Sequence, residues 1–300
     1  MIERILLADS GTGHSEEMLQ ALMAIPSIRR AMVTILHVVP PQISAMQMEA
    51  KTEQGSVLVQ AAIDRLKLDP EKVSVVIRSG DPKLVVCEVA EEVNTDLIIM
   101  GSRGTKSRLL SIFENSVSQY VFQLSPRPML LVKDDLYVRP IQRVTVAMDK
   151  SEMSKKSLHL ALFLLRDMPE SKLNLVHIDP NAKAELSGAA AERDSVLSSA
   201  LAAVKRYGID CRCFVGTGKA GETICRIAEE TRTDLLLLGS PDRRPSIGRN
   251  LPDIDRLLGS SLSDYVRTHA TCPVLMSRAA GLFLKPLFRI RVQHLISELL

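Results

Sequence analysis

The chain has 300 residues, of which 46% are hydrophobic and 24% charged, and its formal net charge is +3. This composition is typical of a soluble globular protein, and so small a net charge argues against nucleic acid as the main partner. At about 150 residues per domain, the length predicts two domains, each long enough to bury a core of its own.

We expect neither a membrane-spanning helix nor a signal peptide. No run of about 20 apolar residues occurs, and Met1–Arg4 leads directly into a segment typical of a strand. The five cysteines are odd in number and lack the spacing of metal ligands. This cysteine usage favours a reducing compartment, so we expect a cytoplasmic protein.

Strands and helices alternate along the first half of the chain. The apolar run Ile5–Ala8 predicts a strand buried on both faces. Asp81 and Pro82 are typical of the cap and first turn of a helix. The other elements that we predict here are strands over residues 31–39, 73–77, 96–100 and 129–132, and helices over residues 15–24, 49–66 and 116–123.

The second half repeats the first. Thr95–Ser102 returns as Thr233–Ser240, and Ser116–Val121 returns as Ser261–Val266. A period of about 140 residues is that of a whole domain rather than a solenoid unit. Matching strands are predicted near residues 144–148, 172–177, 210–214, 235–238 and 274–276.

This alternation predicts an α/β fold: two tandem flavodoxin-like (Rossmann-like) domains, each a five-stranded parallel sheet with helices on both faces. We assign residues 1–138 to the first copy, 141–278 to the second and 279–300 to a carboxy-terminal extension. The two copies are expected to pack as an internal pseudo-dimer.

A candidate ligand site follows the fourth strand of the first copy. Gly101 and Gly104 stand at either end of a strand-to-helix turn, where glycine lets backbone N–H groups approach an anion. Ser116 can cap the following helix or bind a phosphate, and the helix start favours negative charge. Asp9 ends the first strand beside this turn and can meet a ribose hydroxyl or an adenine edge. Val38 can contact the base.

These segments, together with the strand end Leu36–Pro40 and the turn Gly80–Pro82, resemble the universal stress protein family. The resemblance covers both copies up to about Ser277. It implies an α/β fold, often dimeric, and a cytoplasmic role in stress survival. One branch of the family binds ATP through a pattern of Gly-x-x-Gly, nine residues, then Gly-Ser/Thr, and another branch lacks the pattern.

Both copies depart from that pattern. In the first copy, Gly101 and Gly104 match, but Glu114 and Asn115 stand nine residues later, so Asn115 and Ser116 would take the Gly-Ser places after a one-residue insertion. In the second copy, Asp242 replaces the second glycine within a longer segment rich in proline and arginine. The residues that we expect to bind ATP, with Mg²⁺ as a potential companion, are Asp9, Ser10, Val38, Gly101, Arg103, Gly104, Asn115, Ser116 and Val117.

Three functions remain open at this stage. The first is a non-enzymatic stress-response binding module with ATP in the first copy. The second is an interaction scaffold without nucleotide, and the third is a slow ATPase. We expect no catalytic residue and no metal site.

Several other features have structural explanations that we prefer. Gly216–Lys219 lacks the residues of a P-loop and matches the turn at Gly80. His37 and His177 at matched strand ends are interpreted as structural rather than as catalytic bases, and Cys211 and Cys213 as an ordinary strand pair. The apolar and basic tail, residues 279–300, is a packing extension or oligomer contact, a membrane-surface segment, or disordered.

Overall fold

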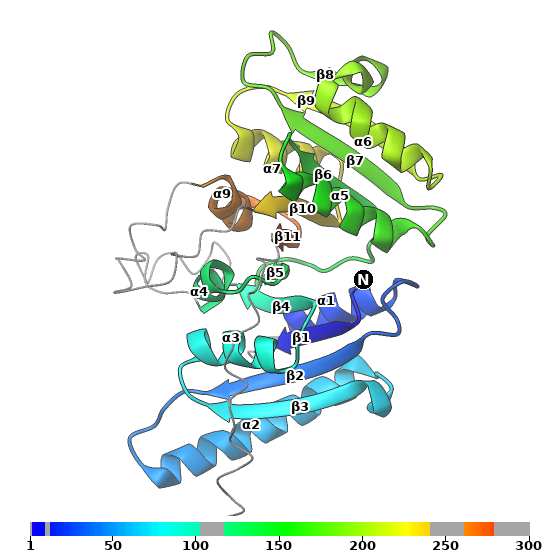
Figure 1. Ribbon diagram of the computed structural model, residues 1–300. Helices are drawn as coiled ribbons and strands as arrows, with labels where there is room; N and C mark the ends of the chain where they lie inside the picture. The colour runs from blue at the N-terminus through cyan, green and yellow to red at the C-terminus, as the bar shows by residue number, and fades with distance from the viewer. Residues whose placement is uncertain (1, 10–12, 103–116, 241–260, 279–300) are drawn as a thin grey trace, which may run out of the picture.

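The computed structural model describes residues 2–9, 13–102, 117–240 and 261–278 (Figure 1). Its strands form one 11-stranded sheet in the order β3-β2-β1-β4-β5-β11-β10-β6-β7-β9-β8. The first copy supplies one end of this sheet and the second copy supplies the other. The α/β prediction with two tandem copies is confirmed.

In the first copy, each predicted strand is present and its ends agree within two residues. The elements are β1 (Arg4–Ala8), α1 (His14–Met23), β2 (Met32–Val39), α2 (Ala45–Leu66), β3 (Val73–Ser79), α3 (Pro82–Glu92), β4 (Leu97–Ser102), α4 (Val117–Leu124) and β5 (Met129–Lys133), with a 3-10 turn at Pro70–Lys72. The main difference is α2, which begins at Ala45 rather than at Glu49 because Ser44 caps it by accepting a hydrogen bond from the amide of Gln47 (3.2 Å).

The second copy repeats the order with one addition. Its elements are β6 (Arg143–Met148), α5 (Glu152–Leu165), β7 (Lys172–Ile178), β8 (Leu186–Ser187), the 3-10 helix η3 (Gly188–Arg193), α6 (Ser195–Lys205), β9 (Asp210–Gly216), α7 (Ala220–Glu230), β10 (Leu235–Ser240), α9 (Leu262–His269) and β11 (Val274–Arg278). The expected count of five strands was wrong here, because the two-residue β8 pairs antiparallel with β9 and covers the sheet edge.

Strand order within each copy differs from that of flavodoxin. Pairing is parallel throughout β3-β2-β1-β4-β5, and the corresponding five strands of the second copy pair in the same way. This 3-2-1-4-5 order is that of the first five strands of a Rossmann sheet, whereas flavodoxin has 2-1-3-4-5. The chain therefore reverses direction across the sheet between β1 and β4, and that point is where a ligand is expected.

The two copies join through an antiparallel pair, β5 with β11, in which Leu130 lies opposite Leu275. The strand ends reach across this joint. Lys133 Nζ donates to the carbonyl oxygen of Thr268 in α9 (3.3 Å), and the Arg278 guanidinium lies 4.0 Å from the centre of the Phe122 ring in α4. The predicted packing of one copy against the other is thereby confirmed.

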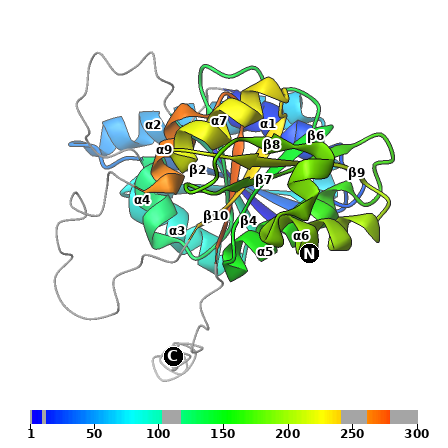
Figure 2. The ribbon, with the colours of Figure 1, turned by 90° about the horizontal axis from the view of Figure 1, so that it is seen from above.

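The core lies on both faces of the sheet. Along β1, Ile5 and Leu7 face one buried cluster and Leu6 and Ala8 face the other. Helices α1, α2, α5 and α6 pack into the first cluster, and α3, α4, α7 and α9 pack into the second. Seen from above, the molecule has helices on both sides of its strands (Figure 2). Both clusters contain residues of both copies, so the joint is part of one continuous core.

The strongest sequence repeat serves to hold the sheet together. Asp96 accepts from the amides of Glu3 (2.8 Å) and Arg4 (2.9 Å), and so links the start of β4 to the start of β1. Asp234 accepts in the same way from the amide of Arg143 (2.8 Å) in the second copy. The repeated aspartate therefore has a structural role in both copies.

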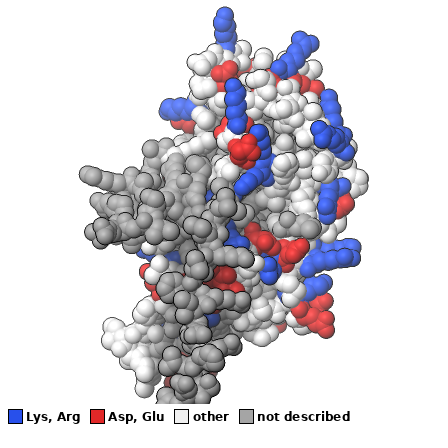
Figure 3. Space-filling view, viewed as in Figure 1, with Lys and Arg blue, Asp and Glu red and all other residues white. Residues whose placement is uncertain are grey.

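The surface and the helices bear on two further expectations. On the face shown in Figure 3, the positive and negative side chains of the described residues are interspersed, in keeping with the small net charge. Among the described helices, none combines the length and apolar character needed to cross a membrane. Residues 241–260 and the tail 279–300 lie outside the described part, and the domain boundaries stay predictions.

Candidate functional site

A cavity of about 610 Å³ lies at the carboxyl ends of β1, β2 and β4, where the chain reverses across the sheet. This position is the general ligand site of open α/β sheets, and the volume falls within the range of about 300–1,000 Å³ usual for small-molecule sites. The residues that line it are Ala8, Asp9, Leu36, His37, Val38, Val39, Pro40, Gln42, Lys51, Gln54, Leu58, Pro82, Val86, Met100, Gly101, Ser102, Val117, Ser118 and Asp134.

Four of the predicted site residues meet in this cavity: Asp9, Val38, Gly101 and Val117. They come from the ends of three strands and the start of α4, segments that are far apart in the sequence. Parallel strands end at the same edge of a sheet, which is why the sequence alone could bring these residues together. The other five predicted residues, Ser10, Arg103, Gly104, Asn115 and Ser116, lie outside the described residues, so their role stays a prediction.

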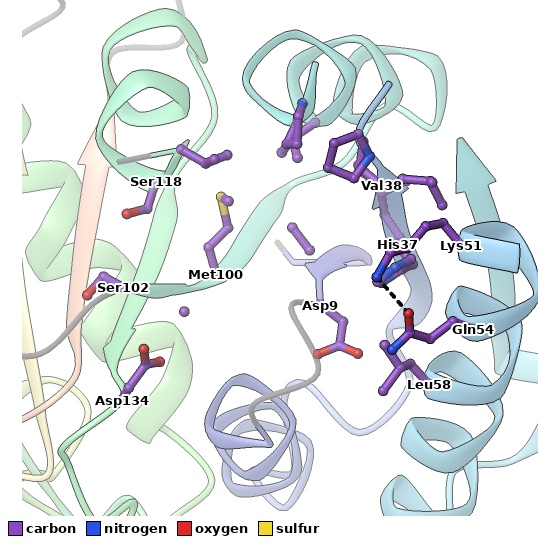
Figure 4. Close-up of a pocket in the computed structure, with 18 of the residues that line it drawn as sticks. Asp9, His37, Val38, Lys51, Gln54, Leu58, Met100, Ser102, Ser118 and Asp134 are labelled. Carbon is purple, nitrogen blue, oxygen red and sulfur yellow. Dashed lines mark hydrogen bonds between the residues drawn. The ribbon is translucent and has the colours of Figure 1, made fainter. Parts of the chain in front are cut away.

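Asp9 lies at the centre of the site. Its amide donates to the carbonyl oxygen of Leu36 (2.9 Å), which extends the pairing of β1 with β2 by one residue beyond the strand. The residue is only 6% exposed. Figure 4 shows Asp9 between a wall that includes His37 and Gln54 and a wall that includes Ser102 and Asp134.

Helix α2 supplies part of the lining that sequence reasoning missed. Lys51, Gln54 and Leu58 line the cavity and recur at spacings of three and four, so they share one face of the helix. Gly55 was the signal in the sequence that could have revealed this contact. Glycine within a helix lowers the stability of the helix by about 1 kcal/mol relative to alanine, so its presence there needs a structural reason. The prediction that began α2 at Glu49 gave no ground for placing this helix over the end of β2.

The reason for Gly55 is the ring of His37. A β-carbon at position 55 would lie 2.7 Å from His37 Cδ2 and 3.2 Å from His37 Nε2. Glycine therefore lets the imidazole lie directly against the backbone of α2. His37 itself lines the cavity. The amide oxygen of Gln54, one residue before Gly55, accepts a hydrogen bond from Lys51 Nζ (3.0 Å; Figure 4).

His177, the matched histidine of the second copy, has a different environment. Its Nδ1 lies 3.1 Å from Oδ1 of Asp194, and the same carboxylate oxygen caps α6 by accepting from the amides of Val196 (2.9 Å) and Leu197 (3.0 Å). Burial would raise the pKa of Asp194, but these amides and the charge of His177 outweigh it and hold the pKa below its usual value. The surroundings of His177 agree with a structural role.

In the second copy, the residues that match Asp9 and Gly101 have close protein neighbours. Asp149, which matches Asp9, accepts from the amide of Ser151 (2.8 Å) and from its hydroxyl. Burial would raise the pKa of Asp149, but these hydrogen bonds hold it below its usual value. Gly239, which matches Gly101, lies beneath the start of α5: a β-carbon there would be 2.6 Å from the carbonyl carbon of Met153 and 2.7 Å from the amide nitrogen of Ser154.

The charges of the first cavity suit a largely neutral group. The described lining contains two carboxylates, Asp9 and Asp134, and one lysine, Lys51. Apolar surface from Val39, Met100 and their neighbours can hold a planar ring, and Asp9 can accept hydrogen bonds from hydroxyl groups. The described residues therefore fit the base and ribose of a nucleotide, whereas the groups expected to hold its phosphates belong to residues 103–116.

Two observations on the described part of the chain concern metal ligands and cysteines. No cluster of three or more His, Cys, Asp or Glu side chains there has the arrangement of a metal site. All five cysteines are unpaired, and Cys211 and Cys213 lie together on β9.

Comparison with known proteins identifies the family. The model of the universal stress protein family matches residues 1–133 and 140–278. The chain belongs to this family. The resemblance seen in the sequence is thus confirmed for both copies, and this tandem universal stress protein has about the length of two family domains. Proteins of the family are generally non-enzymatic and act in the response to stress.

Individual relatives agree with this assignment. Universal stress protein Sll1654 from Synechocystis sp. is 29% identical over 136 residues, which cover 44% of this chain and 86% of that protein. Universal stress protein YxiE from Bacillus subtilis is 28% identical over 150 residues, covering 44% of this chain and 100% of that protein. A universal stress protein structure from Archaeoglobus fulgidus covers 94% of this chain and 100% of its own, with a TM-score of 0.71 and 21% identity, which shows a shared fold.

Proposed function

We propose that the first copy binds an adenine nucleotide, with ATP as the principal ligand, and that the protein is a non-enzymatic binding module of the cytoplasmic stress response. The observation that supports this most is the cavity at the β1–β4 reversal, which unites Asp9, Val38, Gly101 and Val117. The cytoplasmic site of action rests on the cysteine usage of the sequence.

The lining suggests one orientation for the ligand. The base lies against Val38 and Met100, and the ribose hydroxyls donate to the carboxylate of Asp9. The phosphates then extend past Gly101 toward residues 103–116, where Gly104 and Ser116 are the predicted donors. The acidic side chains remain with the neutral half of the ligand, which avoids placing a carboxylate beside a phosphate.

The second copy is proposed not to bind nucleotide at the matched position. Its Asp149 carboxylate is engaged by Ser151, and the start of α5 lies on Gly239. A single nucleotide per chain is the expected stoichiometry.

Isothermal titration calorimetry of the full chain with ATP tests the proposal, and Asp9→Ala and Asp149→Ala form a matched pair of variants. We expect one site, an affinity lowered about tenfold or more by Asp9→Ala, and an unchanged affinity in Asp149→Ala, since the loss of a charge-assisted hydrogen bond is worth about 1.5–3 kcal/mol. A wild-type protein that binds no ATP would instead support the nucleotide-free scaffold.

A further inference from the structure

Strand β3 forms one end of the sheet and, among the described strands, pairs with β2 alone. The amide of Gly80, just after β3, donates to the carbonyl oxygen of Val39 in β2 (3.0 Å). Because successive residues of a strand direct their backbone groups to opposite sides, those of Val75 and Ile77 are directed away from β2. An apolar edge strand of seven residues with such groups is a template for a further strand.

The matched edge in the second copy carries a further strand. His37 pairs with Ile77 in the first copy and His177 pairs with Val215 in the second, so Ile77 and Val215 occupy the same place. Val215 pairs with Leu186 of β8, which runs antiparallel to β9. This fold therefore accepts an added strand at the position where the first copy, in its described part, has none.

The two faces of β3 differ in chemistry. Ile77 packs against the buried cluster that includes α2, and Val75, on the same face, is 44% exposed. On the other face, Arg78 forms an ion pair with Glu92 of α3 (2.9 Å), and the exposed Glu88 precedes Glu92 by one turn. A strand added here would meet apolar side chains on one face and carboxylates on the other.

The tail, residues 279–300, contains a segment that matches both faces. Its residues Phe288-Arg289-Ile290-Arg291-Val292 alternate between apolar and basic. In a strand, this alternation places the three apolar side chains on one face and the two arginines on the other. The apolar face suits Val75, and the arginines suit the carboxylates of α3.

The length of the tail allows the segment to reach β3. Met276 of β11 lies opposite Met129, where β5 begins, so the tail starts beside the amino ends of the first-copy strands. Five strand spacings separate β11 from β3, which amounts to about 24 Å. The nine residues 279–287 span about 30 Å when extended.

We propose that residues 288–292 add to the edge of β3 in the same chain as a further strand, which covers this end of the sheet as β8 covers the other. Phe288, Ile290 and Val292 then lie on the face of Val75, and the two arginines lie on the face of Glu88. The tail is thus a packing extension of the first copy, although it follows the second copy in the sequence.

Hydrogen–deuterium exchange of the full chain, read by mass spectrometry, tests this pairing. In wild type, the amides of residues 288–292 should exchange at least about tenfold more slowly than in a free peptide of the same sequence, because a paired amide exchanges only when the pair opens. Val75→Lys places a charge on the apolar face of the β3 edge and should remove this protection. Ile290→Glu should in turn speed the exchange of residues 73–79.

Leu186→Lys is the matched control. Leu186 lies in β8 at the other end of the sheet and is 42% exposed, close to the exposure of Val75. Its substitution should leave the exchange of residues 288–292 unchanged.

Three results would overturn the proposal. The first is exchange of residues 288–292 as fast as in the free peptide, and the second is protection that persists in Val75→Lys or is lost equally in Leu186→Lys. The third is protection that rises with protein concentration, which would show that the segment pairs with a second copy rather than within its own chain.

Discussion

The two copies link their strands in the same way, but the segments that follow the carboxyl ends of the first strands differ. Asp96 and Asp234 make equivalent links to the first strand of each copy. Beyond the strand, α1 begins five residues after Asp9, whereas α5 begins three residues after Asp149. The shorter connection brings the start of α5 onto Gly239, and the longer one accompanies an open cavity.

This difference shows how a repeat can keep a scaffold while its sites diverge. Links such as Asp96 and Asp234 stabilise the sheet whether or not a ligand binds. The cavity depends on residues just outside the strands, where a change of two residues in length moves a helix without disturbing the core. Four predictions test this comparison, beginning with the largest expected effect.

The first prediction concerns the contact between the two copies, where the matched positions 122 and 267 carry different residues. Phe122 is 2% exposed and carries the Arg278 guanidinium on its ring, so Phe122→Ala should lower the free energy of unfolding by about 4 kcal/mol through the cavity it leaves. Arg267 holds the matched place in α9, and its guanidinium lies 3.8 Å from the buried carboxylate of Asp264. Arg267→Ala should lower the free energy of unfolding by about 3 kcal/mol, because it leaves that carboxylate without its arginine. Urea denaturation measures both losses, and a loss under about 1 kcal/mol in Arg267→Ala would contradict the contribution of the ion pair.

The second prediction concerns the matched glycines Gly101 and Gly239, which lie where the chain reverses direction across the sheet. Gly239→Ala places a β-carbon against the backbone of Met153 and Ser154, and we expect a loss of about 3 kcal/mol because backbone cannot move aside as a side chain can. Gly101 lines the cavity instead, so the cost of Gly101→Ala should be under about 1 kcal/mol. ATP affinity should fall only in Gly101→Ala. Thermal unfolding and calorimetry measure the two effects separately.

Asp194 tests the structural use of the second histidine. Asp194→Ala removes the cap of α6 and the partner of His177, and should cost about 1–2 kcal/mol. Because the folded pKa of this carboxyl is depressed, its stabilisation is present above about pH 4 and is lost as the pH falls through the folded pKa. Denaturation at several pH values should show the gap between wild type and variant closing in acid. A gap that widened in acid would contradict the direction of the shift.

Gly55→Ala should have the smallest effect on stability. Alanine gains about 1 kcal/mol of helix propensity, while its methyl group must displace the ring of His37, so the net change in unfolding temperature should be near zero. ATP affinity should nevertheless fall, because a displaced His37 ring changes the wall of the cavity that it lines. An unchanged ATP affinity in calorimetry would contradict a role for the position of His37 in ligand binding.

Local patterns explain why much of the fold could be predicted. Ile5–Ala8 is apolar on both faces because β1 is central in the sheet, and Asp81 caps α3 by accepting from the amide of Lys83 (3.0 Å), as the pattern with Pro82 indicated. Periodicity reports burial along one element and does not report which elements become neighbours. It therefore gave no sign of β8, of the early start of α2 or of the 3-2-1-4-5 strand order.

The candidate site, too, was predicted only in part from the sequence. Asp9, Val38, Gly101 and Val117 follow from the sequence, because parallel topology alone requires strand ends to meet at one edge. The place of Lys51 and Gln54 was decided only by the packing of α2 on β2, through the contact of Gly55 with His37. The same holds for Gly239 beneath α5 and for the pairing of β5 with β11. These contacts join residues distant in the sequence, and their free energy depends on shape and volume in three dimensions, which no local pattern contains.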